Sequence, residues 1–223
     1  VEGRKTVIDM NNTQPMEPIV KRREKAGNRG ERILKWGAER NKAKYAAIVG
    51  AGGSGSRLQF DHAKGLFPAT PVSGISLYEA LIQEMQSAAK AYGHKAVYPF
   101  VIMVSDNTEE ETIKYITSLP EWNDIKDRVV FTRQRLLPGL RRNPNNPDDG
   151  KAFLKSKDHI YFEGTGHGDA FDYVLNRDAK VKGLTWSDEK NAFLEVGVVK
   201  CLKEFGVEYV QFVSIENHLM PIP

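Results

Sequence analysis

The sequence is poor in cysteine and in long apolar stretches. It has one cysteine, Cys201, so an internal disulfide is excluded and a reducing, cytosolic compartment is favoured. No apolar run approaches the roughly 18 residues that a membrane-spanning helix needs. The first residues of the chain also lack the apolar core and the cleavage site of a signal peptide. From these absences we expect a cytoplasmic protein without a membrane partner.

Neither sign of charge dominates the chain, whose formal net charge is +3. Residues 1–44 hold twelve of the 32 Lys and Arg but six of the 29 Asp and Glu, so the rest of the chain carries −3. We therefore predict a basic N-terminal arm at residues 1–44 and a domain at residues 45–223. A nucleic-acid partner for the arm stays an alternative, although Trp36 is its one aromatic residue for stacking on bases.

Residues 45–223 alternate short apolar runs with amphipathic patterns. Strands are predicted at residues 45–49, 96–104, 128–134, 151–155, 159–162 and 207–214. Helices are predicted to begin near residues 76 and 108 and to span residues 169–175 and 191–205. Capping boxes mark the first two helices, Ser76 with Glu79 and Thr108 with Glu111. This alternation favours an α/β fold with a mostly parallel mixed sheet flanked by helices.

A glycine-rich loop follows the first predicted strand, where residues 50–58 read GAGGSGSRL. Residues without bulk let several backbone N–H groups approach a ligand together, and such a nest suits phosphate. Arg57 and Lys64 place two cations beside the loop. Because ligands of open α/β sheets gather beyond the carboxyl ends of strands, we expect a phosphate-binding site here. The alternative is a glycine-rich turn with two surface cations.

Two commoner phosphate motifs fit this loop poorly. Gly50, Gly52 and Gly55 match G-x-G-x-x-G. The dinucleotide fingerprint, however, needs a helix that opens at the loop and an acidic residue about 20 positions later, at the end of a second strand. Here the loop runs on to Pro68, and Glu79 lies inside an amphipathic helix. A Walker-type P-loop is excluded because no Gly-Lys-Ser/Thr closes the loop.

Several segments together resemble the eukaryotic-type UTP:sugar-1-phosphate uridylyltransferases, also called UDP-sugar pyrophosphorylases. The matching segments are residues 51–58, 64–68, 99–108, 131–140, 166–169 and 206–219. They occur in the order of the family and cover the chain from about residue 45 to its C-terminus. The resemblance implies a nucleotide-diphospho-sugar transferase (Rossmann-like) fold. It also implies that Mg²⁺ and UTP bind at the carboxyl ends of the first strands.

The resemblance assigns roles to individual residues. Arg57 and Lys64 would act on the phosphates as catalytic residues, and Glu216 would hold the metal. The nucleotide-binding residues would be Ala51, Gly52, Gly53, Gly55, Gln134, Gly166 and His167. The implied reaction transfers UMP from UTP to a sugar 1-phosphate and releases pyrophosphate. Positioning and charge neutralisation carry such a step without a covalent nucleophile.

The sequence departs from the family pattern at several positions. Ser56, Gln59 and Ala63 replace the usual Thr, Gly and Pro, which are mild changes. Glu216 stands where the family has the Asp of an Asp-Asn pair, and its extra methylene shifts the oxygens where Mg²⁺ geometry is strict. His167 is typical of glucose-type and broad-specificity members, whereas N-acetylglucosamine-type members carry Asn. We therefore expect glucose 1-phosphate or a related hexose 1-phosphate as the acceptor.

Other interpretations stay open at this point. Family members continue beyond the position of Pro223, so we expect an N-terminal fragment or a truncated relative with an incomplete fold. Glu216 and this early stop favour a non-catalytic nucleotide-binding or scaffolding module as the first alternative. A nucleic-acid-associated protein that binds through its basic arm is the second. Without the resemblance, Gln134 is a polar residue at a strand end and His167 a loop histidine bonded to backbone.

Overall fold

The computed structural model describes residues 45–217, except residues 71, 92–97, 141–149 and 177 and the side chains of Arg57 and Ala91. The predicted arm at residues 1–44 therefore lies outside the described residues. None of the helices in the described ranges combines the length and the apolar character that a membrane span requires.

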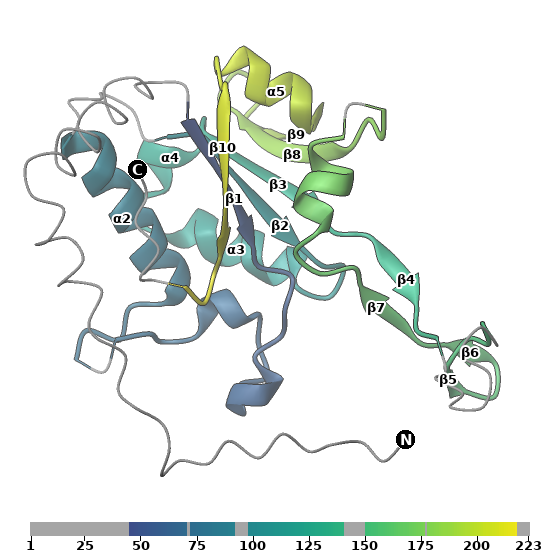
Figure 1. Ribbon diagram of the computed structural model, residues 1–223. Coiled ribbons are helices and arrows are strands. Elements are labelled where there is room, and N and C mark those ends of the chain that lie inside the picture. The colour runs from purple at the N-terminus through teal and green to yellow at the C-terminus, as the bar shows by residue number, and fades with distance from the viewer. Residues whose placement is uncertain (1–44, 71, 92–97, 141–149, 177, 218–223) are drawn as a thin grey trace, which may run out of the picture. The chain divides into compact units, whose positions relative to one another are not determined.

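A six-stranded mixed sheet forms the centre of the described domain (Figure 1). Its strands, in spatial order, are β10 (Tyr209–Ser214), β1 (Tyr45–Gly50), β2 (Phe100–Val104), β3 (Val129–Arg133), β8 (Lys182–Ser187) and β9 (Ala192–Gly197). The first four strands are mutually parallel, and β8 and β9 form an antiparallel hairpin beside β3. The predicted α/β fold with a mostly parallel sheet is confirmed.

Helices cover both faces of this sheet, which explains why β1 and β2 are apolar throughout. Alternate residues of β1 enter opposite clusters: Ala47 and Val49 face one, and Ala46 and Ile48 face the other. The first cluster is closed by α2 (Leu77–Ala91), α3 (Glu109–Ser118) and α4 (Trp122–Ile125). The second is closed by the helical turn Ala170–Val174 and by α5 (Val198–Glu204) (Figure 1).

The predicted capping box forms at the start of α2. The Ser76 N–H donates to Glu79 Oε2 at 2.7 Å, and the Glu79 N–H donates to Ser76 Oγ at 3.1 Å. Helix α3 also begins after Thr108 as predicted, but its capping box is wrong. The Thr108 hydroxyl accepts from the Ser105 N–H at 3.1 Å, and Glu111 reaches out of the helix to the glycine loop.

The helix predicted at residues 191–205 is wrong in its first half. Residues 192–197 form β9, and α5 begins at Val198. The apolar side chains of this segment fit a helical period, but Phe193 and Leu194 lie opposite Trp186 and Thr185 on β8. Strand β8, which was not predicted, supplies the hydrogen-bonding partner that makes the segment extended. Tertiary pairing outweighs the local pattern here.

Two short ribbons follow β3. Strand β4 (Leu136–Pro138) pairs with β7 (Phe162–Gly164), and β5 (Leu154–Ser156) pairs with β6 (His159–Ile160). The strands predicted at residues 151–155 and 159–162 correspond to this region with shifted bounds. Figure 1 shows β4 and β7 leading away from the sheet at the end of β3. This ribbon therefore adds residues to one side of the edge where the parallel strands end.

Candidate functional site

The four parallel strands end at one edge of the sheet, where Gly50 lies level with Met103 on β2 and Ser214 on β10. A cleft of about 440 Å³ opens at this edge. Seven of the residues assigned by resemblance line it: Gly52, Gly53, Lys64, Gln134, Gly166, His167 and Glu216. Segments that are far apart in the sequence thus meet at the carboxyl ends of the strands, where ligands of such folds bind.

The glycine loop is held by its pairing with residues 62–64. Gly53 O accepts from the Lys64 N–H at 3.0 Å, and the Gly55 N–H donates to His62 O at 2.8 Å. Glu111 of α3 anchors the second strand of this pairing. Its Oε2 accepts from the Ala63 N–H at 2.7 Å, and its Oε1 lies 2.5 Å from His62 Nδ1. Helix α3 therefore holds the segment that pairs with the glycine loop.

The loop offers free backbone donors to the cleft. Among the described residues, no acceptor takes the N–H groups of Gly52, Gly53 or Ser54. Adjacent free N–H groups of this kind suit the oxygens of a phosphate chain. The N–H of Ala51 is already used, since it donates to Met103 O at 2.9 Å. Of the two buried residues in the predicted set, Ala51 thus belongs to the framework of the loop.

Gly55 is the other buried residue of the predicted set. Its N–H is committed to His62, and a methyl group added there would lie 2.6 Å from the Phe60 carbonyl oxygen. Glycine at this position permits close packing of the loop on itself. Arg57 belongs to a one-turn helix, Ser56–Leu58, and its side chain lies outside the described part of the chain.

Lys64 and Glu216 form an ion pair at the mouth of the loop. Lys64 opens a second one-turn helix, Lys64–Leu66, and its Nζ lies 2.5 Å from Glu216 Oε1. The Lys64 side chain is 16% exposed, whereas that of Glu216 is 57% exposed. A methyl group added at Gly53 would lie 3.5 Å from Lys64 Nζ, so the ammonium group lies beside the glycine loop. Over the described residues, no three His, Cys, Asp or Glu side chains gather as a metal cluster.

The Gln134 amide lies against the glycine loop in the same cleft. The Gln134 N–H donates to Val104 O at 2.8 Å, which extends the pairing of β3 with β2 by one residue. A methyl group added at Gly52 would lie 2.8 Å from the amide carbon, and one at Gly164 would collide with the amide nitrogen. These two glycines therefore make the space that the amide occupies. Gln134 can present both a donor and an acceptor to a ligand.

A tight turn faces Gln134 in the same cleft. Gly166 has a φ of +77°, a conformation that favours glycine. The exposed His167 ring packs against Phe212 of β10 with ring centroids 5.0 Å apart. The turn therefore ties the β7 ribbon to the far edge of the parallel strands, and His167 lines the cleft.

Two residues that sequence reasoning missed connect this turn to β3. Arg135 follows Gln134, and Asp169 follows the glycine turn. The Arg135 Nη2 lies 2.5 Å from Asp169 Oδ1, and the Arg135 main-chain N–H donates to Asp169 Oδ2 at 2.8 Å. A pair of charged residues 34 positions apart carries no local sequence signal. Asp169 does belong to the segment 166–169 that resembles the family, and this was the one available hint.

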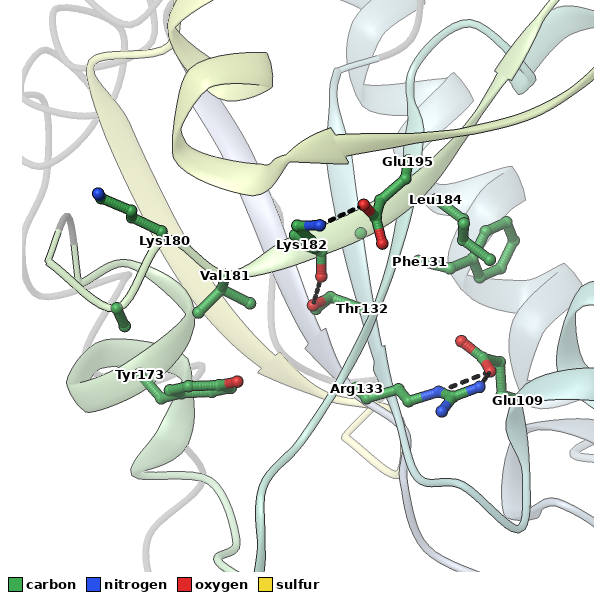
Figure 2. Close-up of a pocket in the computed structure, with 12 residues that line it drawn as sticks. Glu109, Phe131, Thr132, Arg133, Tyr173, Lys180, Val181, Lys182, Leu184 and Glu195 are labelled. Atoms are coloured by element: carbon green, nitrogen blue, oxygen red, sulfur yellow. Dashed lines mark hydrogen bonds and ion pairs between the residues drawn. The ribbon is translucent and has the colours of Figure 1, made fainter.

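A second hollow of about 430 Å³ lies at the end of β3 beside β8 (Figure 2). Two of its cations are already engaged: Arg133 pairs with Glu109, and Lys182 lies 2.5 Å from Glu195. Figure 2 shows the Lys180 ammonium pointing away from the other side chains that line the hollow. Of the predicted residues whose side chains are described, none lines it. The cleft at the glycine loop is therefore the candidate site.

Comparison with known proteins identifies the family of the chain. The family model for UTP–glucose-1-phosphate uridylyltransferase matches residues 2–195. The UDP-N-acetylhexosamine pyrophosphorylase-like protein 1 of Mus musculus is 29% identical over 149 residues, which are 63% of this chain and 28% of that protein. Its Homo sapiens counterpart is 26% identical over 181 residues, 79% of this chain and 31% of that protein.

A similar fold occurs in the crystal structure of the uridine diphosphate N-acetylglucosamine pyrophosphorylase from Trypanosoma brucei. The TM-score is 0.71 at 22% identity, over 90% of this chain and 37% of that one. The chain thus spans about a third of the length of the relatives it matches. The family match takes in residues 2–44 and ends before Glu216. Because the match covers most of the chain, the protein belongs to the UTP–glucose-1-phosphate uridylyltransferase family, the UDP-sugar pyrophosphorylases.

Proposed function

We propose that this protein binds UTP in the cleft and transfers UMP to a sugar 1-phosphate, giving a UDP-sugar and pyrophosphate. The observation that carries the proposal is the arrangement of the cleft. Free N–H groups of Gly52 and Gly53 lie in the same cleft as the Lys64 ammonium, and the Gln134 amide lies against Gly52. A phosphate chain and a nucleobase need these two kinds of group. Membership of the family supports the same assignment.

The proposed reaction depends on positioning of the substrates, and it needs no covalent intermediate with the protein. An oxygen of the sugar 1-phosphate attacks the α-phosphorus of UTP, and the bond from that phosphorus to the bridging oxygen of pyrophosphate breaks. Negative charge shifts onto the leaving pyrophosphate during this step. Lys64, the loop N–H groups and, by resemblance, Arg57 would hold the phosphates in line and neutralise that charge. No residue of the cleft has to form a bond to the substrate.

A divalent metal fits the donors of the cleft through Glu216. Mg²⁺ is commonly bound by one or two carboxylates together with substrate phosphates, so a single carboxylate suffices. Glu216 is that carboxylate, and it already lies beside Lys64 where the phosphates would enter. A bound metal would supply charge neutralisation at the phosphates. The resulting proposal is that Glu216 holds Mg²⁺ jointly with the nucleotide.

Uridine would be recognised where Gln134 and the Gly166 turn line the cleft. The edge of uracil presents both donors and acceptors, which an amide side chain and backbone groups can match. Gln134 and the Gly166 turn face the same space, and His167 lies next to them. We assign base recognition to Gln134 and Gly166, with His167 at the boundary between the base and the rest of the ligand.

The acceptor sugar is the finer part of the proposal. The names of the mouse and human relatives favour an N-acetylhexosamine 1-phosphate, whereas His167 by resemblance favours an unacetylated hexose 1-phosphate. We give precedence to the N-acetylhexosamine because the similarity to these relatives extends over 149 and 181 residues, while one residue supports the other choice. Pyrophosphate release from UTP with N-acetylglucosamine 1-phosphate, compared with glucose 1-phosphate, decides between them. Faster release with glucose 1-phosphate would reverse the assignment.

Titration calorimetry with UTP and Mg²⁺ tests the site itself. We expect Lys64→Ala to weaken binding by about tenfold or more, because a charge-assisted contact to phosphate is lost. Lys200→Ala is the matched control, since it removes a lysine whose side chain is 80% exposed and paired with Glu204 on α5. Equal UTP affinity of wild type and Lys64→Ala would show that Lys64 does not contribute to UTP binding. No UTP binding by the folded wild type would overturn the proposal.

A non-catalytic nucleotide-binding relative is the second candidate function. The observation that favours it is the Lys64–Glu216 pair, in which the proposed metal ligand and the proposed phosphate ligand neutralise each other. Glu216 also lies beyond the part of the chain that the family model matches. Tight UTP binding without pyrophosphate release, with either sugar 1-phosphate present, would support this candidate over turnover.

A further inference from the structure

The Asp169 carboxylate holds Arg135 at three points. Oδ1 accepts from Arg135 Nη2 at 2.5 Å and from Nε at 3.0 Å, and Oδ2 accepts from the Arg135 main-chain N–H at 2.8 Å. The Asp169 side chain is 1% exposed. Both oxygens of this buried carboxylate therefore accept from Arg135, one from its side chain and the other from its backbone. Such a contact fixes the path of the chain at residue 135 as well as its charge.

Residue 135 directly follows the proposed base reader. The Gln134 N–H is bonded to Val104 O, and the next N–H along the chain is bonded to Asp169. The peptide groups on both sides of Gln134 are thus tied down, one to the sheet and one to the segment after the glycine turn. This fixes the backbone from which the Gln134 side chain enters the space that Gly52 and Gly164 keep open.

The same carboxylate belongs to the segment that carries the other proposed base contact. The Asp169 N–H donates to Gly166 O at 3.3 Å, so the glycine turn closes on the residue that holds Arg135. On the Arg135 side, the Thr165 N–H donates to Arg135 O at 3.1 Å. Residues 134–135 and 165–169 are therefore cross-linked in both directions. The Arg135 guanidinium also lies 4.7 Å from the centre of the Tyr173 ring, which limits its movement.

The pair stays charged across the neutral range. Burial alone would raise the pKa of Asp169, but the hydrogen bonds from Arg135 and Thr165 outweigh burial and lower this pKa below its ordinary value. The carboxylate therefore remains an acceptor at physiological pH. A buried ion pair adds little stability in many proteins, and its best-attested use is to select one arrangement of the chain. The pair lies next to Gln134 and the Gly166 turn, so the arrangement that it selects is that of these two segments.

We propose that the Asp169–Arg135 pair is a positioning device for base recognition, which holds the Gln134 amide and the Gly166 turn in register for uracil. The inference rests on the proposed function, because it names how the same cleft selects its nucleotide. The pair does not line the cleft, so it would act on the ligand indirectly, through Gln134 and the turn. Loss of the pair should therefore affect the base and spare the phosphates.

Calorimetric titrations with three probes in the presence of Mg²⁺ separate these effects: UTP, CTP and inorganic tripolyphosphate. CTP differs from UTP at the base edge, so the ratio of their affinities reports base recognition. For Asp169→Asn we expect UTP affinity to fall by about tenfold, the equivalent of one hydrogen bond to the base. The preference for UTP over CTP should fall with it, and tripolyphosphate affinity should stay unchanged.

Two further variants secure the interpretation. Arg135→Lys keeps the positive charge but loses the fork that engages the carboxylate, so it should lose part of the UTP preference. It decides the question alone if Asp169→Asn does not fold. Glu195→Gln is the control, because it breaks the exposed Lys182–Glu195 pair of the β8–β9 hairpin and should change none of the three affinities.

The outcomes distinguish the inference from the function on which it rests. If wild type binds UTP and both variants of the pair keep its affinity and its preference over CTP, the positioning role is overturned and the proposed function stands. If the variants weaken UTP, CTP and tripolyphosphate equally, the pair supports the fold and has no role in base selection. If wild type binds tripolyphosphate but does not distinguish UTP from CTP, both proposals fall.

Discussion

Glu111 shows how a residue outside the cleft can set the phosphate-binding loop. Its carboxylate accepts from the Ala63 N–H and contacts His62, two of the three residues that pair with the glycine loop. We expect Glu111→Ala to weaken tripolyphosphate binding several-fold, because the segment that positions Gly53 and Lys64 loses its anchor. The free energy of unfolding should fall by about 1–2 kcal/mol for the lost charge-assisted bonds. Calorimetry and urea unfolding measure the two effects.

The neighbouring carboxylate supplies the control for this variant. Glu110 lies in the same turn of α3 but is exposed, and no contact of its side chain is known among the described residues. Glu110→Ala should leave phosphate binding unchanged. If Glu111→Ala and Glu110→Ala bind tripolyphosphate equally well, the glycine loop keeps its shape without α3.

Sequence reasoning found the residues of the cleft more readily than the residues that support them. Glycines, Lys64 and Gln134 stand in motifs that carry their own chemical meaning. Glu111 fits a capping box with Thr108, and the local pattern cannot reveal that Ala63, 48 residues earlier, competes for its carboxylate. Asp169 and Arg135 likewise come into contact only in the folded chain. Partners distant in sequence are set by tertiary packing, which single-sequence patterns do not encode.

At the scale of a single element, the capping box of α2 predicts how stability depends on pH. Burial opposes ionisation of Glu79, but its bonds from Ser76 and Tyr115 outweigh burial and lower its pKa. A lowered pKa in the folded state contributes stability above the unfolded pKa, and this stability is lost as the pH falls through the folded pKa. Glu79→Gln should therefore flatten the acid side of the stability curve below about pH 4.3, the ordinary pKa of Glu.

Urea unfolding at neutral and acidic pH measures this effect. Wild type should lose up to about 1 kcal/mol more than Glu79→Gln between the two conditions, which is the scale of a helix cap. Glu84→Gln removes a carboxylate from the same helix outside the cap and should keep the wild-type pH dependence. Parallel pH profiles for wild type and Glu79→Gln would show that the cap is not linked to protonation.

The β8–β9 hairpin depends on a close approach at Gly183. A methyl group there would lie 2.6 Å from the Phe131 carbonyl oxygen on β3 and 2.8 Å from Val130 Cγ1. We expect Gly183→Ala to lower the free energy of unfolding by about 2 kcal/mol or more, because a backbone carbonyl cannot move aside. Gly197→Ala, where the nearest atom would be 3.7 Å away, should cost less than about 1 kcal/mol. Equal urea midpoints for the two variants would contradict this.

The same hairpin explains where element prediction failed. The four parallel strands were predicted because each is a short apolar run followed by a turn or a helix start. Segment 191–205 contains apolar residues that fit one face of a helix, and its division into β9 and α5 depends on pairing with β8. Strand β8 in turn is ordered by β3. An antiparallel extension of this kind depends on pairing within the sheet, so it cannot be predicted from either segment of the hairpin alone.

At the scale of the whole molecule, the order of strands could not be predicted even where the strands were. Strand β10 comes last in the chain but lies beside β1, and this brings Glu216 to Lys64. The resemblance placed both residues at one site, whereas their spacing of 152 positions carries no such information. The spatial neighbourhood of the site is therefore a consequence of topology. The residue types of the site could be identified from the sequence, whereas their arrangement in space required the fold.

The boundary of the domain gives the last prediction. The described members of both buried clusters lie within residues 45–215, and the net charge of residues 45–223 is −3 against +3 for the full chain. We propose that residues 45–223 fold without residues 1–44, so the shortened protein should unfold cooperatively and bind UTP with the affinity of the full chain. Salt-dependent binding to RNA, if the full chain shows it, should disappear with the basic segment. The family match begins at residue 2, so loss of cooperative unfolding in the shortened protein would instead place this segment within the domain.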